Sequence, residues 1–113
     1  MAVIYHMADK SDWDAAVRSG VYNGTANDRA DGFIHFSTAD TVVESAAKHR
    51  AGAPNLLLIA VESEVLGAAL KWEAARGGIL FPHLYGPLDP ALVISAVDLP
   101  LGPDNRHLFP ELE

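Results

Sequence analysis

The sequence predicts a single domain that combines short strands with a few helices. The chain has 113 residues, half of them apolar, which is enough for one hydrophobic core but not for two. The run 56–61 is apolar at every position, as in a buried central strand. Apolar residues recur at helical spacing over 11–19 and 38–50, so we expect helices there.

Alternating patterns and turn signals predict the strands, which we expect near residues 2–7, 32–37, 55–62, 69–73, 79–85 and 91–98. The segment 32–37 is the most informative, because successive strand side chains point to opposite faces. Ile34 and Phe36 share one face, which we expect to join the core. The other face can form a site and carries Phe33, His35 and Ser37.

Turn and cap signals predict how these elements are joined. Ser11-x-x-Asp14 and Ser37-x-x-Asp40 resemble capping boxes, so we expect them to begin the two helices. The segment 21–31 is rich in Asn, Asp and Gly and is expected to be a loop that leads into the site. Pro82 indicates that the strand near 79–85 lies at a sheet edge or carries a bulge.

Charge and composition exclude several classes of protein. The net charge is −7, and the longest basic run covers only 48–50, which disfavours binding to nucleic acids and to anionic membranes. The absence of cysteine excludes thiol catalysis, disulfides and thiolate metal sites. No leader is evident, and no apolar run approaches the roughly 20 residues that span a bilayer, so we expect a soluble cytoplasmic protein without a membrane partner.

The candidate site is a dispersed set of side chains, because no standard short motif for phosphate, dinucleotide, zinc or nucleophilic chemistry is present. Three of its histidines and one glutamate could bind zinc, but none of them has the close spacing of a typical metal site, so we expect no metal. We expect His6, His35 and Glu73 to line one cleft, with His83 and Tyr85 in its wall.

Six short segments carry a family resemblance. They are Tyr5-His6, Trp13, Gly-Val-Tyr at 20–22, Asp-Gly-Phe-Ile-His-Phe-Ser-Thr at 31–38, Leu-Lys-Trp-Glu at 70–73 and Phe-Pro-His-Leu-Tyr-Gly-Pro-Leu at 81–88. Together they resemble the short bacterial proteins grouped as domain-of-unknown-function family 952. The resemblance implies an α+β domain similar to the ADP-ribosyltransferase fold, with a split, mostly antiparallel sheet and small flanking helices around a nicotinamide-dinucleotide cleft.

The wider superfamily implies roles for individual residues. Its members hold the ribose with a polar residue, often His, on the first core strand, and His6 matches that place. RNA 2′-phosphotransferases show a similar Val/Ile-His-x-Ser, which His35 and Ser37 match. Many members carry a catalytic Glu on a later strand, where Glu73 or, as a variant, His83 would stand. These matches imply an ADP-ribosyl-type site.

Elementary chemistry supports such a site independently. Cleavage of the bond between nicotinamide and ribose needs a carboxylate near the ribosyl cation, a stacking surface for the base, and hydrogen-bond donors. Glu73 supplies the carboxylate, and Tyr85 or Phe33 supplies the stacking surface. The hydrogen-bond donors are His6, His35, Ser37 and Arg76.

The sequence departs from the phosphotransferases at one place. Tyr5 replaces the Arg that phosphotransferases have beside the first His, so phosphate transfer from RNA is not expected.

Three classes of function follow from these observations. The first is an enzyme that acts on a small-molecule ligand, with NAD as candidate substrate and Glu73, His35 and His83 as catalytic residues. The second is a noncatalytic module that binds a related ligand in the same cleft. The third is a small structural or regulatory partner protein. Ligand binding separates the first two from the third, and turnover separates the first from the second.

Overall fold

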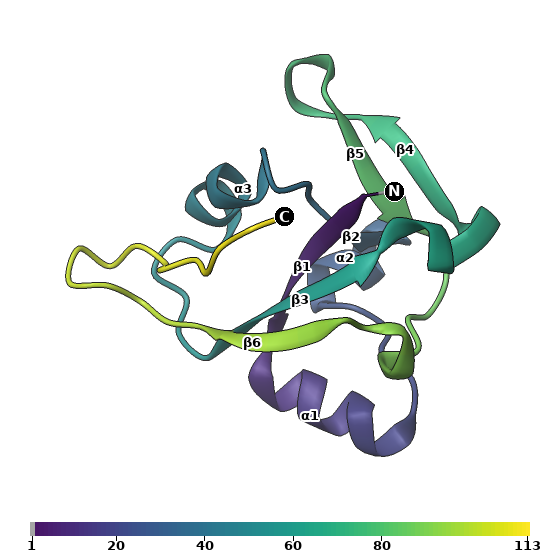
Figure 1. Cartoon of the computed structure of the whole chain (residues 1–113), viewed down its shortest axis with the longest axis horizontal. Coiled ribbons are helices and arrows are strands. Elements are labelled where there is room, and N and C mark those ends of the chain that lie inside the picture. The colour runs from purple at the N-terminus through teal and green to yellow at the C-terminus, as the bar shows by residue number, and fades with distance from the viewer. Residues whose placement is uncertain (1) are drawn as a thin grey trace.

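Two antiparallel three-stranded sheets form the framework of the protein, a computed structural model of which describes residues 2–113, apart from the side chain of Arg76 (Figure 1). The strand order of the first sheet is β1-β3-β6 and that of the second is β2-β5-β4. The strands are β1 (Val3–Asp9), β2 (Ile34–His35), β3 (Leu56–Glu62), β4 (Leu70–Ala74), β5 (Leu80–Leu84) and β6 (Ser95–Leu99). The sequence-based expectation of an α+β protein with antiparallel strands is confirmed.

Helices cover both faces of the first sheet (Figure 1). Trp13 of α1 (Lys10–Ser19) packs with β1 and β3 in one hydrophobic cluster, whereas Val42 of α3 (Val42–His49) packs with the opposite face. The remaining helices are α2 (Ala26–Asp31) and the short 3₁₀ segments η1 (Ser63–Ala69), η2 (Arg76–Gly78) and η3 (Pro90–Leu92). Because both faces are covered, the first sheet forms the centre of the fold.

The buried character of β3 explains its central place. Its residues from Leu56 to Val61 are all buried, as the sequence predicted. They alternate between the clusters, with Leu57 and Ile59 on the α1 side and Leu56 and Leu58 on the other. A strand with two apolar faces is stable only when both faces are covered and both edges are paired, and β1 and β6 pair with the two edges of β3.

The two sheets are joined beside β2. The Tyr5 N–H donates to the Ser37 carbonyl at 2.8 Å, and the Ser37 N–H donates to the Tyr5 carbonyl at 2.7 Å. The expected alternation in this segment is confirmed on its core face, because Ile34 and Phe36 are each 2% exposed. The sheets therefore meet along one short bridge and diverge from it.

Pro82 was expected to mark either a sheet edge or a bulge, and the expectation of an edge is wrong. The strand that contains it, β5, is the centre of the second sheet. The Phe36 N–H donates to the Pro82 carbonyl at 3.0 Å, but proline has no N–H with which to return the bond. The ladder to β2 consequently ends there, and β2 is only two residues long.

The prediction of a loop over 21–31 is also wrong in part, since α2 lies within it. Thr25 and Asp28 form a capping box, in which the Thr25 hydroxyl accepts from the Asp28 N–H and the Asp28 carboxylate accepts from the Thr25 N–H. Gly32 ends the helix at φ 88°, a left-handed conformation that favours glycine. The Thr-x-x-Asp spacing was present in the sequence and is the signal that could have identified this helix.

The capping boxes expected for the two longer helices do not form. The N-cap of α1 is Asp9, two residues before Ser11, and it makes no side-chain cap bond. The N-cap of α3 is Thr41, so the helix begins after the Ser37-x-x-Asp40 segment. The last strand also begins later than predicted, at Ser95, because η3 occupies residues 90–92.

Candidate functional site

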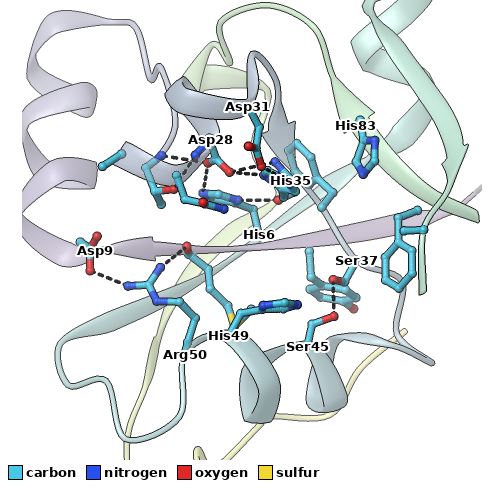
Figure 2. A pocket seen from close by; sticks show the side chains of 18 residues that line it. His6, Asp9, Asp28, Asp31, His35, Ser37, Ser45, His49, Arg50 and His83 are labelled. Carbon is cyan, nitrogen blue, oxygen red and sulfur yellow. Dashed lines mark hydrogen bonds and ion pairs between the residues drawn. The ribbon is translucent and has the colours of Figure 1, made fainter. Parts of the chain in front are cut away.

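A cavity of about 720 Å³ opens between β1 of the first sheet and β2 and β5 of the second, and we call it the fork cavity (Figure 2). Helices α2 and α3 complete its wall. Four of the five histidines of the protein line the fork cavity, namely His6, His35, His49 and His83. Its volume lies within the roughly 300–1,000 Å³ of typical small-molecule sites.

His6 is a buried anchor between segments. Its Nδ1 lies 2.7 Å from the His35 carbonyl, and its Nε2 lies 2.7 Å from the Tyr22 hydroxyl. A carbonyl can only accept, so Nδ1 carries the proton and Nε2 accepts from Tyr22. Burial lowers the pKa of His6, although the nearby Asp28 carboxylate opposes this effect. His6 is therefore neutral, and both of its ring nitrogens have protein partners.

Asp28 is the buried carboxylate of the site and holds His35. One oxygen accepts from the His35 ring Nδ1 at 2.5 Å and from the His35 backbone N–H at 3.2 Å, while the other accepts from the Thr25 N–H at 2.8 Å. Burial alone would raise the pKa of Asp28. The hydrogen bond from the His35 ring and the further contacts with His6 and the two backbone N–H groups outweigh burial and lower it.

His35 lies between two carboxylates (Figure 2). Its Nδ1 faces Asp28, and its Nε2 lies 3.1 Å from an Asp31 oxygen. The hydrogen bond with Asp28 raises the pKa of His35, and Asp31 adds to this effect, whereas partial burial opposes it. The imidazolium form is favoured because only that form can donate from both nitrogens.

A second group of predicted residues gathers around His83. The His83 Nδ1 donates to the Glu73 carboxylate at 2.8 Å, and the Tyr85 hydroxyl donates to the same oxygen at 2.7 Å. The bonds from Tyr85 and then His83 lower the pKa of Glu73, and Glu73 raises the pKa of Tyr85. Phe33 stacks on the His83 ring, with centroids 4.1 Å apart. Glu73 occupies Nδ1, so Nε2 is the nitrogen of His83 that can serve a ligand.

The structure brings some of the predicted site residues together and separates others. The predicted residues that line the fork cavity are His6, His35, Ser37 and His83. Glu73, Tyr85 and Phe33 do not line it. Glu73 bonds to the His83 ring and to the Tyr85 hydroxyl, and Phe33 stacks on the His83 ring. The side chain of Arg76 lies outside the described part of the structure.

Ser37 does not cap α3. Its side chain is buried, and its hydroxyl donates to the Ser45 hydroxyl at 3.1 Å, on the wall of the fork cavity. The hydroxyl therefore holds the segment after β2 against α3 rather than starting that helix.

Sequence reasoning missed several residues of the fork cavity. Asp28 and Asp31 were not predicted as site residues, because their segment was interpreted as a loop. His49 and Arg50 were not among the predicted site residues, yet both line the cavity, where an Arg50 guanidinium nitrogen lies 2.7 Å from an Asp9 oxygen. No sequence signal connects Asp9 with Arg50, because their contact depends on the packing of α3 against β1.

Among the described residues, no group of three or more His, Asp or Glu side chains is placed to hold a metal ion. The ring nitrogens of His6 and the Nδ1 atoms of His35 and His83 instead bond to protein groups. Within the same residues, no helix combines the length and apolar character needed to cross a bilayer.

The family described as "Protein of unknown function (DUF952)" matches residues 7–96, which is most of the chain. The chain belongs to the DUF952 family. Among the described residues that line the fork cavity, only Tyr5 and His6 fall outside this match, so nearly all of the described lining lies in the DUF952 region. No curated protein matches the chain at a significant level.

Solved structures give a close likeness over almost the whole chain. The crystal structure of protein CC0527 from Caulobacter crescentus is 48% identical, with a TM-score of 0.90, and the match covers 94% of this chain and 93% of that one. The solution NMR structure of the same protein is 49% identical, with a TM-score of 0.83 and coverage of 94% and 91%. The likeness concerns family and fold.

Proposed function

We propose that the fork cavity binds a nicotinamide dinucleotide or a related ADP-ribosyl compound. The observation that carries the proposal is the convergence of four histidines on one cavity between diverging sheets (Figure 2). In the ADP-ribosyltransferase fold, which the sequence resembles, a split sheet surrounds a dinucleotide cleft. The two sheets of this protein diverge around the fork cavity in a comparable way, which supports the same kind of ligand.

The lining of the fork cavity suits both parts of such a ligand. Aromatic side chains line the cavity and can pack against a planar base, and they come from Tyr5, Phe81 and His83. Arg50 and His35 are the cationic groups suited to phosphate oxygens, and each already compensates one carboxylate. Arg50 keeps further N–H donors after its contact with Asp9, since a guanidinium has five.

For an enzyme, the reaction class is cleavage of the bond between nicotinamide and ribose. His35 and His83 line the fork cavity and are the candidates to touch substrate. Glu73 was predicted as the catalytic carboxylate. Because it bonds to His83 and does not line the cavity, we propose that it is a positioning residue, which orients the His83 ring.

Binding is tested by narrowing the fork cavity. We expect Ala75→Trp to weaken binding of NAD at least tenfold, because Ala75 is exposed at the cavity wall and an indole would occupy ligand space. Isothermal titration with NAD, ADP-ribose and nicotinamide measures the effect. Ala15→Trp is the matched control, since Ala15 is exposed on α1, away from the cavity, and should bind as wild type. Equal binding by both variants would place the ligand elsewhere.

Turnover is tested by nicotinamide release. If the protein is an enzyme, Glu73→Gln should lower the release rate on the order of a hundredfold, because the side chain keeps its size and loses its charge. Glu44→Gln removes the same charge from the exposed surface of α3 and should leave the rate unchanged. Binding without release by wild type would assign the noncatalytic module. A folded protein that binds none of the compounds would retire the proposal in favour of a regulatory partner protein.

A further inference from the structure

We infer that Asp28 positions His35 to donate a hydrogen bond from Nε2 to an anionic group of the ligand, and that Asp31 occupies this donor when no ligand is bound. The inference rests on the proposed binding function of the fork cavity and names the chemistry recognised at one point of it. That chemistry is an anionic oxygen, which a phosphate or a carboxylate group can supply.

The fixed half of this arrangement is Asp28. Its side chain is 4% exposed, and it is held in place by the capping box with Thr25. One carboxylate oxygen accepts from both the ring and the backbone N–H of His35, so the ring has a single favoured orientation. A carboxylate accepts only, which requires the proton on Nδ1. The other nitrogen of His35 is thereby directed away from Asp28.

The exchangeable half is Asp31. Its side chain is 47% exposed, and its carboxylate lies 3.1 Å from Nε2 of His35 at the wall of the fork cavity. Ion pairs that are open to water contribute little, because solvent competes with both partners. A ligand oxygen delivered by a molecule that also fills the cavity can therefore replace Asp31. Asp28 cannot be replaced in the same way, since its carboxylate is buried.

The charges around His35 favour its cationic form. Asp28 and Asp31 of α2 face its two nitrogens. The His83 ring of β5 lies edge-on to the His35 ring, with the two ring centroids 5.5 Å apart. His6 of β1 is a further titratable neighbour, and it is neutral. Asp28 first and Asp31 next raise the pKa of His35, against partial burial. Anion binding should therefore be strong while His35 is protonated and decline as pH rises through its pKa.

The first experiment follows the histidine side chains by NMR during a pH titration of the ligand-free protein. We expect Asp28→Asn to lower the pKa of His35 towards its ordinary value, because the amide lacks the carboxylate charge that stabilises the imidazolium. Thr25→Ala is the matched control, because it breaks the other half of the capping box without touching His35. It should destabilise α2 and leave the titration of His35 unchanged. An unchanged titration in Asp28→Asn would overturn the positioning role.

The second experiment measures binding of ADP-ribose, inorganic phosphate and acetate between pH 5.5 and 9. Asp31→Asn removes the competing carboxylate from an exposed position, so we expect about fivefold tighter binding of the anion that the site recognises. Tighter binding of ADP-ribose and phosphate but not acetate would assign a phosphate group, and the reverse would assign a carboxylate. His35→Gln should remove the pH dependence of anion binding. If Asp28→Asn fails to fold, this variant still tests whether His35 binds the anion.

The outcomes separate the inference from the proposed function. Equal affinity of wild type and Asp31→Asn for every probe that binds would overturn the inference alone. Failure of every probe to bind either protein would overturn the proposed function, whatever the titration of His35 shows.

Discussion

Replacing His6 with alanine is expected to lower the free energy of unfolding by about 3–5 kcal/mol. The side chain is almost fully buried, and its two ring nitrogens bond to the His35 carbonyl and the Tyr22 hydroxyl, each at 2.7 Å. The variant leaves both groups without the His6 ring as partner. It also opens a void beside Phe36, whose ring centroid lies 5.6 Å from that of the imidazole. Urea denaturation at pH 8 measures the loss.

His107→Ala is the matched control for this prediction. His107 also makes a hydrogen bond through its ring, from Nε2 to the Ala53 carbonyl at 2.9 Å, but it lies in the partly exposed C-terminal segment. Loss of one such bond should cost about 1 kcal/mol. If the two variants lose equal stability, the network around His6 is not the anchor that the structure indicates.

The loss in His6→Ala should also depend on pH. Burial lowers the pKa of His6 below 6.5, so the folded protein resists the proton that the unfolded chain takes up. The stabilisation from the neutral ring is present above pH 6.5 and declines as pH falls towards the folded-state pKa. His6→Ala should therefore lose less stability at pH 5.5 than at pH 8. The raised pKa of His35 acts in the opposite sense and is common to both proteins.

The strands were the most predictable part of the fold because their signals are local. The alternation around Ile34 and Phe36 and the doubly apolar run of β3 depend only on which face each side chain occupies. This is why all six strands and the two longer helices were expected near their observed places. The order of the strands within each sheet is not local, and Pro82 was misplaced for that reason. The ADP-ribosyltransferase likeness stays a proposal.

The helix α2 was missed because composition and capping gave opposite signals. Asn and Asp are typical of loops, but Thr25 and Asp28 satisfy the first turn of a helix here. The Asp28 carboxylate also gains hydrogen bonds from His35, seven residues later, which only the folded turn through Gly32 allows. Tertiary contacts thus stabilise a helix of six residues that its sequence alone would not favour.

The sequence could predict which side chains of the candidate site lie near one another, but not which of them line the fork cavity. Glu73, His83 and Tyr85 were expected at one cleft, and the Glu73 carboxylate does accept hydrogen bonds from both of the others. It could not show that His83, stacked on Phe33, would stand between Glu73 and the fork cavity. Side chains on one face of a twisted sheet can open into different spaces, and only the packing of α2 and α3 decides which of them share a cavity.

Phe36→Ala is expected to lower the free energy of unfolding by about 3–5 kcal/mol, which is the usual range for a fully buried phenylalanine. Phe36 is 2% exposed and lies at the junction of the two sheets, where its backbone N–H donates to Pro82. Its ring packs in the main hydrophobic cluster and contacts His6. Truncation therefore leaves a void between the sheets. Urea denaturation measures the loss.

Phe33→Ala makes the same change three residues earlier on the opposite face. Phe33 is only partly buried and stacks on His83, so its loss should cost about 1–2 kcal/mol and should shift the NMR signals of the His83 ring. Phe36→Ala should leave the stack of Phe33 on His83 in place. If the two variants cost the same, or if Phe33→Ala leaves His83 unaffected, the division of this segment into a core face and a site face is wrong, and with it the basis for placing His35 at the ligand.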